Sequence, residues 1–98
     1  MVAIIAFVYG KESETGKLKE ALKELGRETI REKGNLSFLM HQKQDDPSTF
    51  IFYETYASEE AFTSHLNSNH AKKFGDVFTA QKLGRAETEI VRLSKVEL

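Results

Sequence analysis

Histidine, glutamate and tyrosine side chains in the middle of this sequence are suited to acid–base chemistry near neutral pH. Glu54 lies within the aromatic run from Phe50 to Tyr56, and His65 follows three residues after Phe62 on the apolar side of an expected helix. A carboxylate in an apolar strand needs a partner, and a histidine on a helix packed over the same sheet would supply one. We therefore expect Glu54 and His65 to form a catalytic general base or acid.

Other residues nearby are candidates for contact with a small-molecule substrate. The hydroxyls of Tyr53 and Tyr56 can orient a substrate oxygen. The many phenylalanines favour a pocket for a flat, apolar ligand, and any one of them also fits a purely structural role in the core. The two histidines have structural readings as well, His65 as a core residue and His70 as a residue at a helix start. The expected substrate-binding residues are Tyr53, Tyr56, His70, Asn35 and Phe74.

Metal binding is a further possibility that the residue types raise. Two histidines with Glu54 are the donor types of the two-histidine, one-carboxylate set that holds non-haem iron. However, the five-residue spacing of His65 and His70 does not place them on one face of one helix. The chain has no cysteine, which excludes disulfides and thiolate metal sites. We expect no metal and no cofactor.

Composition indicates one ordinary globular domain over residues 1–98, with 40% hydrophobic and 30% charged residues. The net charge of −1 gives no electrostatic footprint for nucleic acid or for an anionic membrane. Interleaved charges such as Arg31-Glu32-Lys33 are typical of solvated helix faces. Residues 1–9 are apolar but lack a basic leader and a small-residue cleavage site, so we expect a cytoplasmic protein without a signal peptide or membrane span.

The pattern of apolar residues predicts four strands and two helical regions. Strands are expected at 2–9, 36–43, 49–56 and 87–94, with a turn at 44–48. A helix is expected from about Ser13 to the region before Gly34, and a second helical region from Ser58 to Gly84 with an interruption at 67–69. Ser13 or Thr15, Ser58 and Asn69 are the expected helix caps. The order β-α-β-β-α-β predicts a ferredoxin-like α+β fold, a four-stranded antiparallel sheet with its helices on one face.

The second face of this sheet is predicted to be apolar too. Large apolar side chains occupy both alternating sets of positions in the first three strands, for example Ile5 and Phe7 opposite Ile4 and Val8. Monomers rarely expose such a face, so we expect a homodimer packed through the open sheet face. A monomer with some exposed apolar residues is the alternative.

Between Gly34 and Phe74 the sequence contains a series of spaced motifs, namely Gly34-Asn35-Leu36-x-Phe38, Asp46-Pro47-x-x-Phe50, Tyr53-Glu54-x-Tyr56-x-Ser58-x-x-Ala61, His65-x-x-Ser68-x-His70 and Phe74. This series resembles the antibiotic biosynthesis monooxygenase superfamily, in particular its small quinol monooxygenases and its enzyme that processes phosphorylated autoinducer-2. The resemblance covers nearly the whole chain and is most specific between residues 31 and 78.

This resemblance implies a dimeric α+β barrel of ferredoxin-like subunits. It also implies that Glu54 and His65 are site residues. It implies a cofactor-free monooxygenase that oxidises a quinol-like or phenolic molecule with dioxygen, His65 being the base that Glu54 orients. Haem degradation is disfavoured, because the chain has no tryptophan and its first strand has no asparagine. An isomerase or degradation enzyme of the phosphorylated autoinducer-2 type and a non-catalytic dimeric ligand-binding module remain alternatives.

Overall fold

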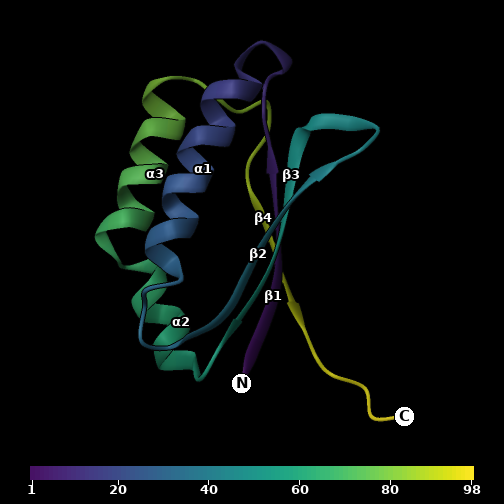
Figure 1. Ribbon diagram of the computed structural model, residues 1–98, viewed down its shortest axis with the longest axis vertical. Helices are drawn as coiled ribbons and strands as arrows, with labels where there is room; N and C mark the ends of the chain where they lie inside the picture. The colour runs from purple at the N-terminus through teal and green to yellow at the C-terminus, as the bar shows by residue number, and fades with distance from the viewer.

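The computed structural model describes residues 1–98 as one four-stranded antiparallel sheet with all three α-helices on the same face (Figure 1). This arrangement confirms the predicted ferredoxin-like α+β fold. The second helical region is divided into two helices by residues 67 and 68. In chain order the elements are β1 (Val2–Tyr9), a short 3-10 helix η1 (Glu12–Glu14), α1 (Thr15–Thr29), β2 (Asn35–Lys43), β3 (Asp46–Tyr56), α2 (Glu59–Leu66), α3 (Asn69–Ala80) and β4 (Glu89–Leu93).

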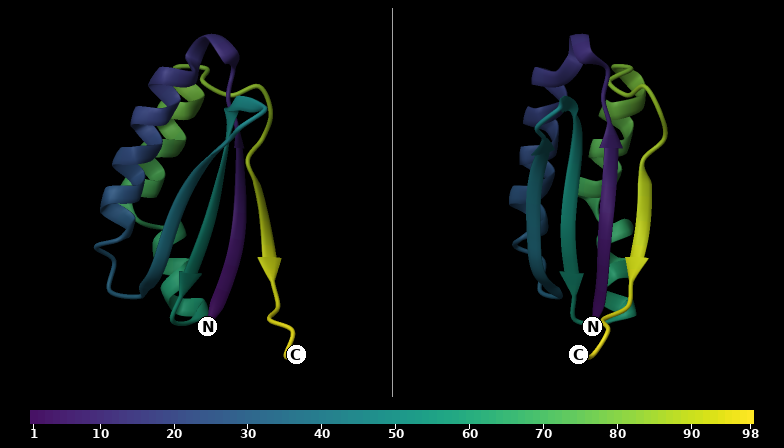
Figure 2. Two further views of the ribbon diagram at one scale, coloured as in Figure 1. Left: turned by 45° about the vertical axis from the view of Figure 1, so that its right-hand side comes forward. Right: turned by 90° about the vertical axis from the view of Figure 1, so that its right-hand side faces the viewer.

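The sheet has the strand order β2-β3-β1-β4, so β3 and β1 form its centre. Figure 2 shows the helices as one layer, with nothing on the other side of the sheet. Because side chains alternate along a strand, every second residue of β1 is buried beneath the helices, namely Val2, Ile4, Ala6 and Val8. The same alternation on β3 directs Glu54 and Tyr56 toward the helices, since they pair with Ile4 and Val2.

Two clusters of buried side chains form the core between the sheet and the helices. The larger one joins Phe50 and Phe52 of β3 to Leu18 and Leu22 of α1. The smaller one joins Val2, Ile4 and Tyr56 to Phe62 of α2. This second cluster lies at the end of the sheet where the sequence placed its catalytic residues, so it forms the apolar setting of the site.

Helix α1 is shorter than predicted, because it ends at Thr29 and a turn leads to β2. The Thr29 hydroxyl donates to the carbonyl oxygen of Leu25 at 2.8 Å and so stays within the last helical turn. The start of the helix also differs from the prediction. Neither Ser13 nor Thr15 caps it, since the N-cap position belongs to Glu14, whose side chain accepts no capping hydrogen bond.

The caps of the following helices agree with the prediction at one position and differ at the other. The Ser58 hydroxyl accepts a hydrogen bond from the Ala61 N–H at 3.1 Å, which confirms the predicted cap of α2. The cap of α3 is Ser68, whose hydroxyl accepts from the Ala71 N–H, whereas Asn69 is already the first helical residue. The β-hairpin turn is also tighter than predicted, because β3 begins at Asp46 and not after Ser48.

The turn between α1 and β2 packs directly against α2, and Gly34 permits this contact. A Cβ atom at Gly34 would lie 2.3 Å from the Cβ atom of Ala61. The Gly34 carbonyl oxygen also accepts a hydrogen bond from the Ala57 N–H at 2.9 Å. The absence of a side chain at position 34 therefore brings the turn, including Glu32, against the helix that carries His65.

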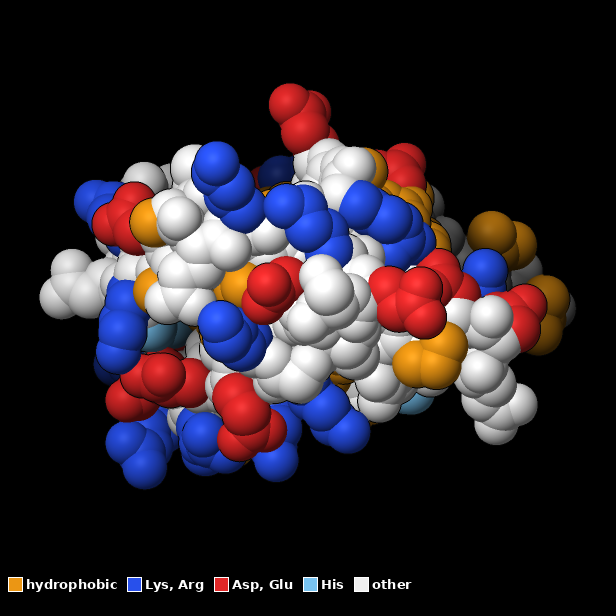
Figure 3. Space-filling model, turned by 90° about the horizontal axis from the view of Figure 1, so that it is seen from above, with side chains coloured by type: hydrophobic (Ala, Val, Ile, Leu, Met, Phe, Trp, Pro, Cys, Tyr) orange, Lys and Arg blue, Asp and Glu red, His pale blue; other side chains and the backbone are white.

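The open face of the sheet carries exposed apolar side chains, as the alternation predicts. Leu39 of β2 and Tyr53 of β3 lie opposite each other there and are 52% and 37% exposed, and Val91 and Leu93 of β4 are also exposed. Elsewhere the charges are mixed, and Figure 3 shows acidic and basic side chains interspersed over one face of the molecule. None of the helices is long and apolar enough to cross a membrane.

Candidate functional site

Glu54 and Tyr56 form the floor of the candidate site on the helix-facing side of β3. The Tyr56 hydroxyl donates a hydrogen bond to Oε1 of Glu54 at 2.6 Å, and both residues are buried. Burial raises the pKa of the Glu54 carboxyl, while the Tyr56 hydrogen bond and the nearby His65 partly offset this. Burial and the Glu54 charge raise the pKa of the Tyr56 hydroxyl, so Tyr56 stays protonated and acts as a donor.

His65 of α2 lies above this pair, next to Glu54 as expected, and the two side chains form no direct hydrogen bond. Its Nε2 atom is 3.8 Å from Oε1 of Glu54, which is an electrostatic contact only. The imidazole packs against the rings of Tyr56 and Phe62, with the Tyr56 centroid 5.2 Å away. The group that holds Glu54 is therefore Tyr56, two residues along the same strand.

A second carboxylate, Glu32, is the direct partner of both histidines. Its Oε2 atom lies 2.8 Å from Nδ1 of His65 and 2.5 Å from Nε2 of His70. The side chains of Glu32, His65 and His70 are 16%, 9% and 23% exposed. Since an ionised carboxylate only accepts hydrogen bonds, the geometry assigns the N–H group to Nδ1 of His65 and to Nε2 of His70. We call Glu32, His65, His70, Glu54 and Tyr56 the histidine cluster.

Glu32 is the member of the histidine cluster that the sequence did not indicate, and its position corrects the assignment of Arg31-Glu32-Lys33 to a solvated helix face. Glu32 lies beyond the end of α1, in the turn that Gly34 holds against α2. One signal was present in the sequence. Two histidines expected near a single glutamate require a further acceptor, since buried polar groups are nearly always hydrogen-bonded.

The histidine cluster also contains the residues that could hold a metal ion. The donor atoms of Glu32, His65 and His70 all lie within 4.8 Å of one another. Two imidazoles and one carboxylate are suited to zinc or iron, so the donor set considered from the sequence is present with Glu32 in place of Glu54. In this structure Oε2 of Glu32 lies between the two nitrogen atoms at hydrogen-bond distances, so each histidine has one hydrogen bond to the carboxylate.

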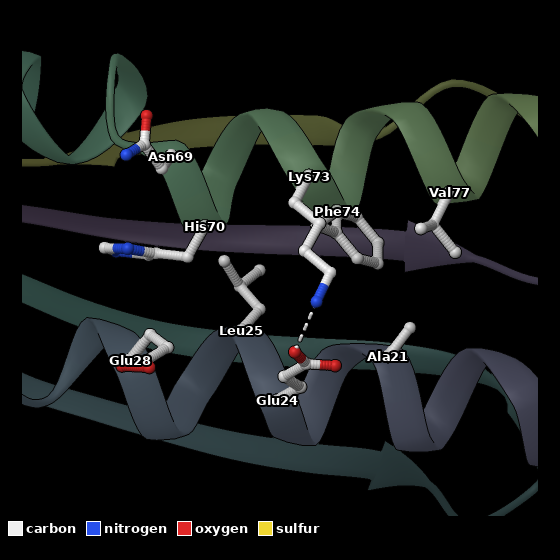
Figure 4. A pocket seen from close by; sticks show the side chains of 9 residues that line it. All are labelled: Ala21, Glu24, Leu25, Glu28, Asn69, His70, Lys73, Phe74 and Val77. Carbon is white, nitrogen blue, oxygen red and sulfur yellow. Dashed lines mark hydrogen bonds and ion pairs between the residues drawn. The ribbon is translucent and has the colours of Figure 1, made fainter.

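A groove of about 360 Å³ runs between α1 and α3 (Figure 4). Of the predicted site residues, His70 and Phe74 line it, whereas Glu54, His65 and Tyr56 do not. His70 thus belongs both to the groove and to the histidine cluster, and it is the member of the cluster through which a ligand in the groove would contact the others. The residues that line the groove are Ala21, Glu24, Leu25, Glu28, Asn69, His70, Lys73, Phe74 and Val77.

The structure separates Tyr53 from the remaining predicted site residues. Tyr53 is one residue from Glu54, so strand alternation directs it to the open face, opposite Leu39 and Ile5. Tyr53 and Tyr56 therefore face opposite sides of the sheet, and the substrate-binding role of Tyr53 stays a prediction. Asn35 pairs with Tyr56 across the sheet, and its amide donates to the carbonyl oxygen of Ser37 at 3.0 Å, where the register shifts. Its side chain therefore supports the start of β2.

Comparison with known proteins agrees with this fold. The family model described as antibiotic biosynthesis monooxygenase matches residues 1–77. The chain belongs to the antibiotic biosynthesis monooxygenase family. The match includes β1, the Glu32 turn, Glu54, His65 and His70, so the histidine cluster lies wholly within the part of the chain that defines the family.

Solved structures show the same architecture over nearly the entire chain. A protein from Nitrosomonas europaea, provisionally named as an antibiotic biosynthesis monooxygenase, is 26% identical with a TM-score of 0.90, covering 99% of this chain and 100% of its own. A crystal structure of an antibiotic biosynthesis monooxygenase gives 23% identity, a TM-score of 0.92 and coverages of 99% and 100%. Rv0793 from Mycobacterium tuberculosis is 21% identical with a TM-score of 0.87, covering 99% of this chain and 96% of its own. Among curated proteins, the comparison finds no match. Family membership and neighbours with this name support a function of the monooxygenase type.

Proposed function

We propose that this family member is a cofactor-free monooxygenase that oxidises a quinol-like or phenolic molecule with dioxygen. The observation that carries the proposal is the double position of His70, which lines the groove and is hydrogen-bonded to Glu32. A histidine paired with a carboxylate at the wall of a partly apolar groove is suited to remove a proton from a bound hydroxyl. The cytoplasmic location stays a prediction from the sequence.

The proposed reaction begins with proton transfer from the substrate hydroxyl to the free Nδ1 atom of His70. Because Nε2–H of His70 is held by Glu32, the carboxylate stabilises the resulting imidazolium. The substrate anion is electron-rich and passes an electron to dioxygen beside the apolar side chains of the groove. A hydroquinone thereby gains one oxygen atom and becomes a hydroxyquinone. The other oxygen atom leaves as water, so the substrate supplies all four electrons.

His65 and Glu54, the catalytic pair expected from the sequence, are proposed to act through His70 as positioning residues. His65 donates Nδ1–H to the same Glu32 oxygen atom that His70 contacts, so it fixes the position of that carboxylate. Glu54 faces the other nitrogen atom of His65 and is itself held by Tyr56. Loss of either group would change the orientation of His70 relative to the substrate.

The charges of the groove argue against the phosphorylated autoinducer-2 alternative. Binding of a phosphate requires cationic donors. Lys73 is the one lysine or arginine that lines the groove, and its Nζ atom is paired with Oε1 of Glu24 at 2.8 Å. The two other charged groove residues outside the histidine cluster are carboxylates, Glu24 and Glu28. An uncharged aromatic hydroxyl compound suits this groove better than a phosphate ester.

Oxygen uptake with a panel of hydroquinones tests the function. We expect consumption by the wild-type protein and a decrease of about 10²- to 10⁴-fold for His70→Ala, the range for loss of a general base. His65→Ala should lose about 10²-fold, because a misplaced catalytic group has that effect. His41→Ala is the matched control, since His41 is an exposed residue of β2 outside the cluster.

Two outcomes would overturn this proposal in different ways. No oxygen consumption by the wild-type protein with any hydroquinone would exclude the proposed monooxygenase reaction and favour a non-catalytic ligand-binding module. Unchanged oxygen consumption by both histidine variants would show that the protein is active but that His70 is not its base. Uptake should also survive dialysis against a chelator, and stoichiometric iron in the purified protein would contradict the cofactor-free assignment.

A further inference from the structure

The groove between α1 and α3 combines an apolar wall with an excess of negative charge. Figure 4 shows Leu25 and Phe74 directed into the space between the helices, with Val77 and Ala21 toward one end. The charged side chains that line the groove are Glu24 and Glu28 of α1 and Lys73 of α3. An aromatic ring can contact the apolar wall, while any charged substituent on it meets this set of three charges.

Lys73 is not available to bind an anion. Its ammonium group is 2.8 Å from Glu24 Oε1, the ion pair drawn across the groove in Figure 4. The hydrogen bond to Glu24 raises the pKa of Lys73, with a further contribution from the Glu28 charge. The same hydrogen bond lowers the pKa of the Glu24 carboxyl. An anionic ligand would have to displace Glu24 from Lys73 and then lie beside two carboxylates.

Glu28, in contrast, has no partner within the groove. Its ion pair is with Arg31 at 3.5 Å, in the turn after α1, and the Arg31 side chain is 76% exposed and that of Glu28 44%. Exposed pairs of this kind contribute little, so Glu28 can exchange Arg31 for another cation at low cost. In Figure 4, Glu28 and His70 lie toward the same end of the groove, on opposite helices.

We propose that the groove selects aromatic hydroxyl compounds that carry a protonated amine, and that Glu28 determines this preference by binding the amine while the hydroxyl faces His70. The inference rests on the proposed function for the choice of an aromatic hydroxyl ligand. The preference itself follows from two carboxylates, one already paired lysine and an apolar wall. Neutral hydroquinones bind in the same place without the ionic contact, and sulfonated, carboxylated or phosphorylated ones are disfavoured.

Anaerobic binding measurements test the preference without any turnover. The probes are hydroquinone, 2-(2-aminoethyl)hydroquinone and hydroquinone sulfonate, which differ in charge on the same ring. We expect the amine to bind about 2- to 5-fold more tightly than hydroquinone, the gain of one exposed ion pair, and the sulfonate more weakly than either. The advantage of the amine should shrink with added salt, because the pair is solvent-exposed.

Two glutamine variants of α1 assign the effect to a residue. Glu28→Gln should remove the preference, so that the amine and hydroquinone bind with equal affinity. Glu20→Gln is the matched control, since Glu20 is on the same helix, is exposed and lies outside the groove. Neither residue belongs to the histidine cluster. Equal effects of the two variants, equal affinities of the three probes, or no binding of any probe would overturn the inference.

The outcomes also separate this inference from the proposed function. Amine-selective binding that depends on Glu28, without oxygen uptake by the wild-type protein, would support the ligand class and contradict the monooxygenase. Oxygen uptake with hydroquinone, together with equal affinities for the three probes, would support the monooxygenase and contradict the preference for amines.

Discussion

The Glu32 carboxylate and the His65 imidazole, 33 residues apart in the chain, meet at 2.8 Å and form the centre of the histidine cluster. The contact joins the turn after α1 to helix α2, and strands β2 and β3 separate these two segments in the chain. His70 binds the same oxygen atom from the start of α3. Three separate segments of the fold are therefore connected through one carboxylate oxygen.

Replacement of Glu32 should affect stability and activity together. Glu32→Ala leaves the N–H groups of His65 and His70 without their acceptor, and we expect a loss of about 1–3 kcal/mol in the free energy of unfolding. Glu32→Gln keeps the shape but not the charge that stabilises a protonated His70, so oxygen uptake should fall more than stability does. Urea denaturation and uptake assays measure the two effects. Wild-type uptake in Glu32→Gln would show that the carboxylate charge has no role.

Burial of Glu54 predicts a specific dependence of stability on pH. The carboxyl has a pKa raised above its ordinary value of 4.5, so the folded protein binds the proton more tightly than the unfolded chain. Its contribution to the free energy of unfolding must therefore decrease as the pH rises from about the unfolded pKa through the raised folded pKa. Glu54→Gln lacks this titration. The difference in unfolding free energy, wild type minus variant, should fall between mildly acidic and neutral pH, and a constant difference would contradict the prediction.

Two glycine substitutions with opposite expected effects test the turn that positions Glu32. At Gly34 an added Cβ would collide with Ala61, and we expect Gly34→Ala to cost about 1–3 kcal/mol, as overpacking does, and to reduce oxygen uptake by displacing Glu32. At Gly16 in α1 an added Cβ meets nothing within 4 Å. Gly16→Ala should stabilise the protein by about 0.4–1 kcal/mol and leave uptake unchanged. Equal effects at the two positions would exclude the close-packing explanation.

The open sheet face predicts a homodimer, in which two such faces pack together. Leu39 and Tyr53 lie opposite each other on this face, and burial of exposed apolar area is the driving force. Leu39→Lys should shift the sedimentation coefficient from dimer to monomer. Ile30→Lys, at another exposed apolar residue but in the turn after α1, should not change it. A monomeric wild-type protein at micromolar concentration would refute the dimer.

The sequence alone determined the fold to a large extent. Alternation of apolar residues identified all four strands, and apolar residues three and four apart identified both helical regions. The helix-facing position of Glu54 follows from its two-residue spacing to Phe52 and Tyr56. The cap at Ser58 was also predictable, because an N-cap is a local hydrogen bond between residues three apart. Such features depend on neighbours in the chain, which the sequence shows directly.

Only the tertiary structure decided which side chains meet. It placed His70 rather than His65 at the groove, and it assigned Glu32 as the partner of both histidines. Nothing local distinguishes Glu32 from the solvated charges around it. Its burial results from the packing of the turn at Gly34 against Ala61, which brings together segments distant in the chain. A contact of this kind depends on how the helix layer packs on the sheet, so it cannot be predicted from the spacing of residues in the sequence.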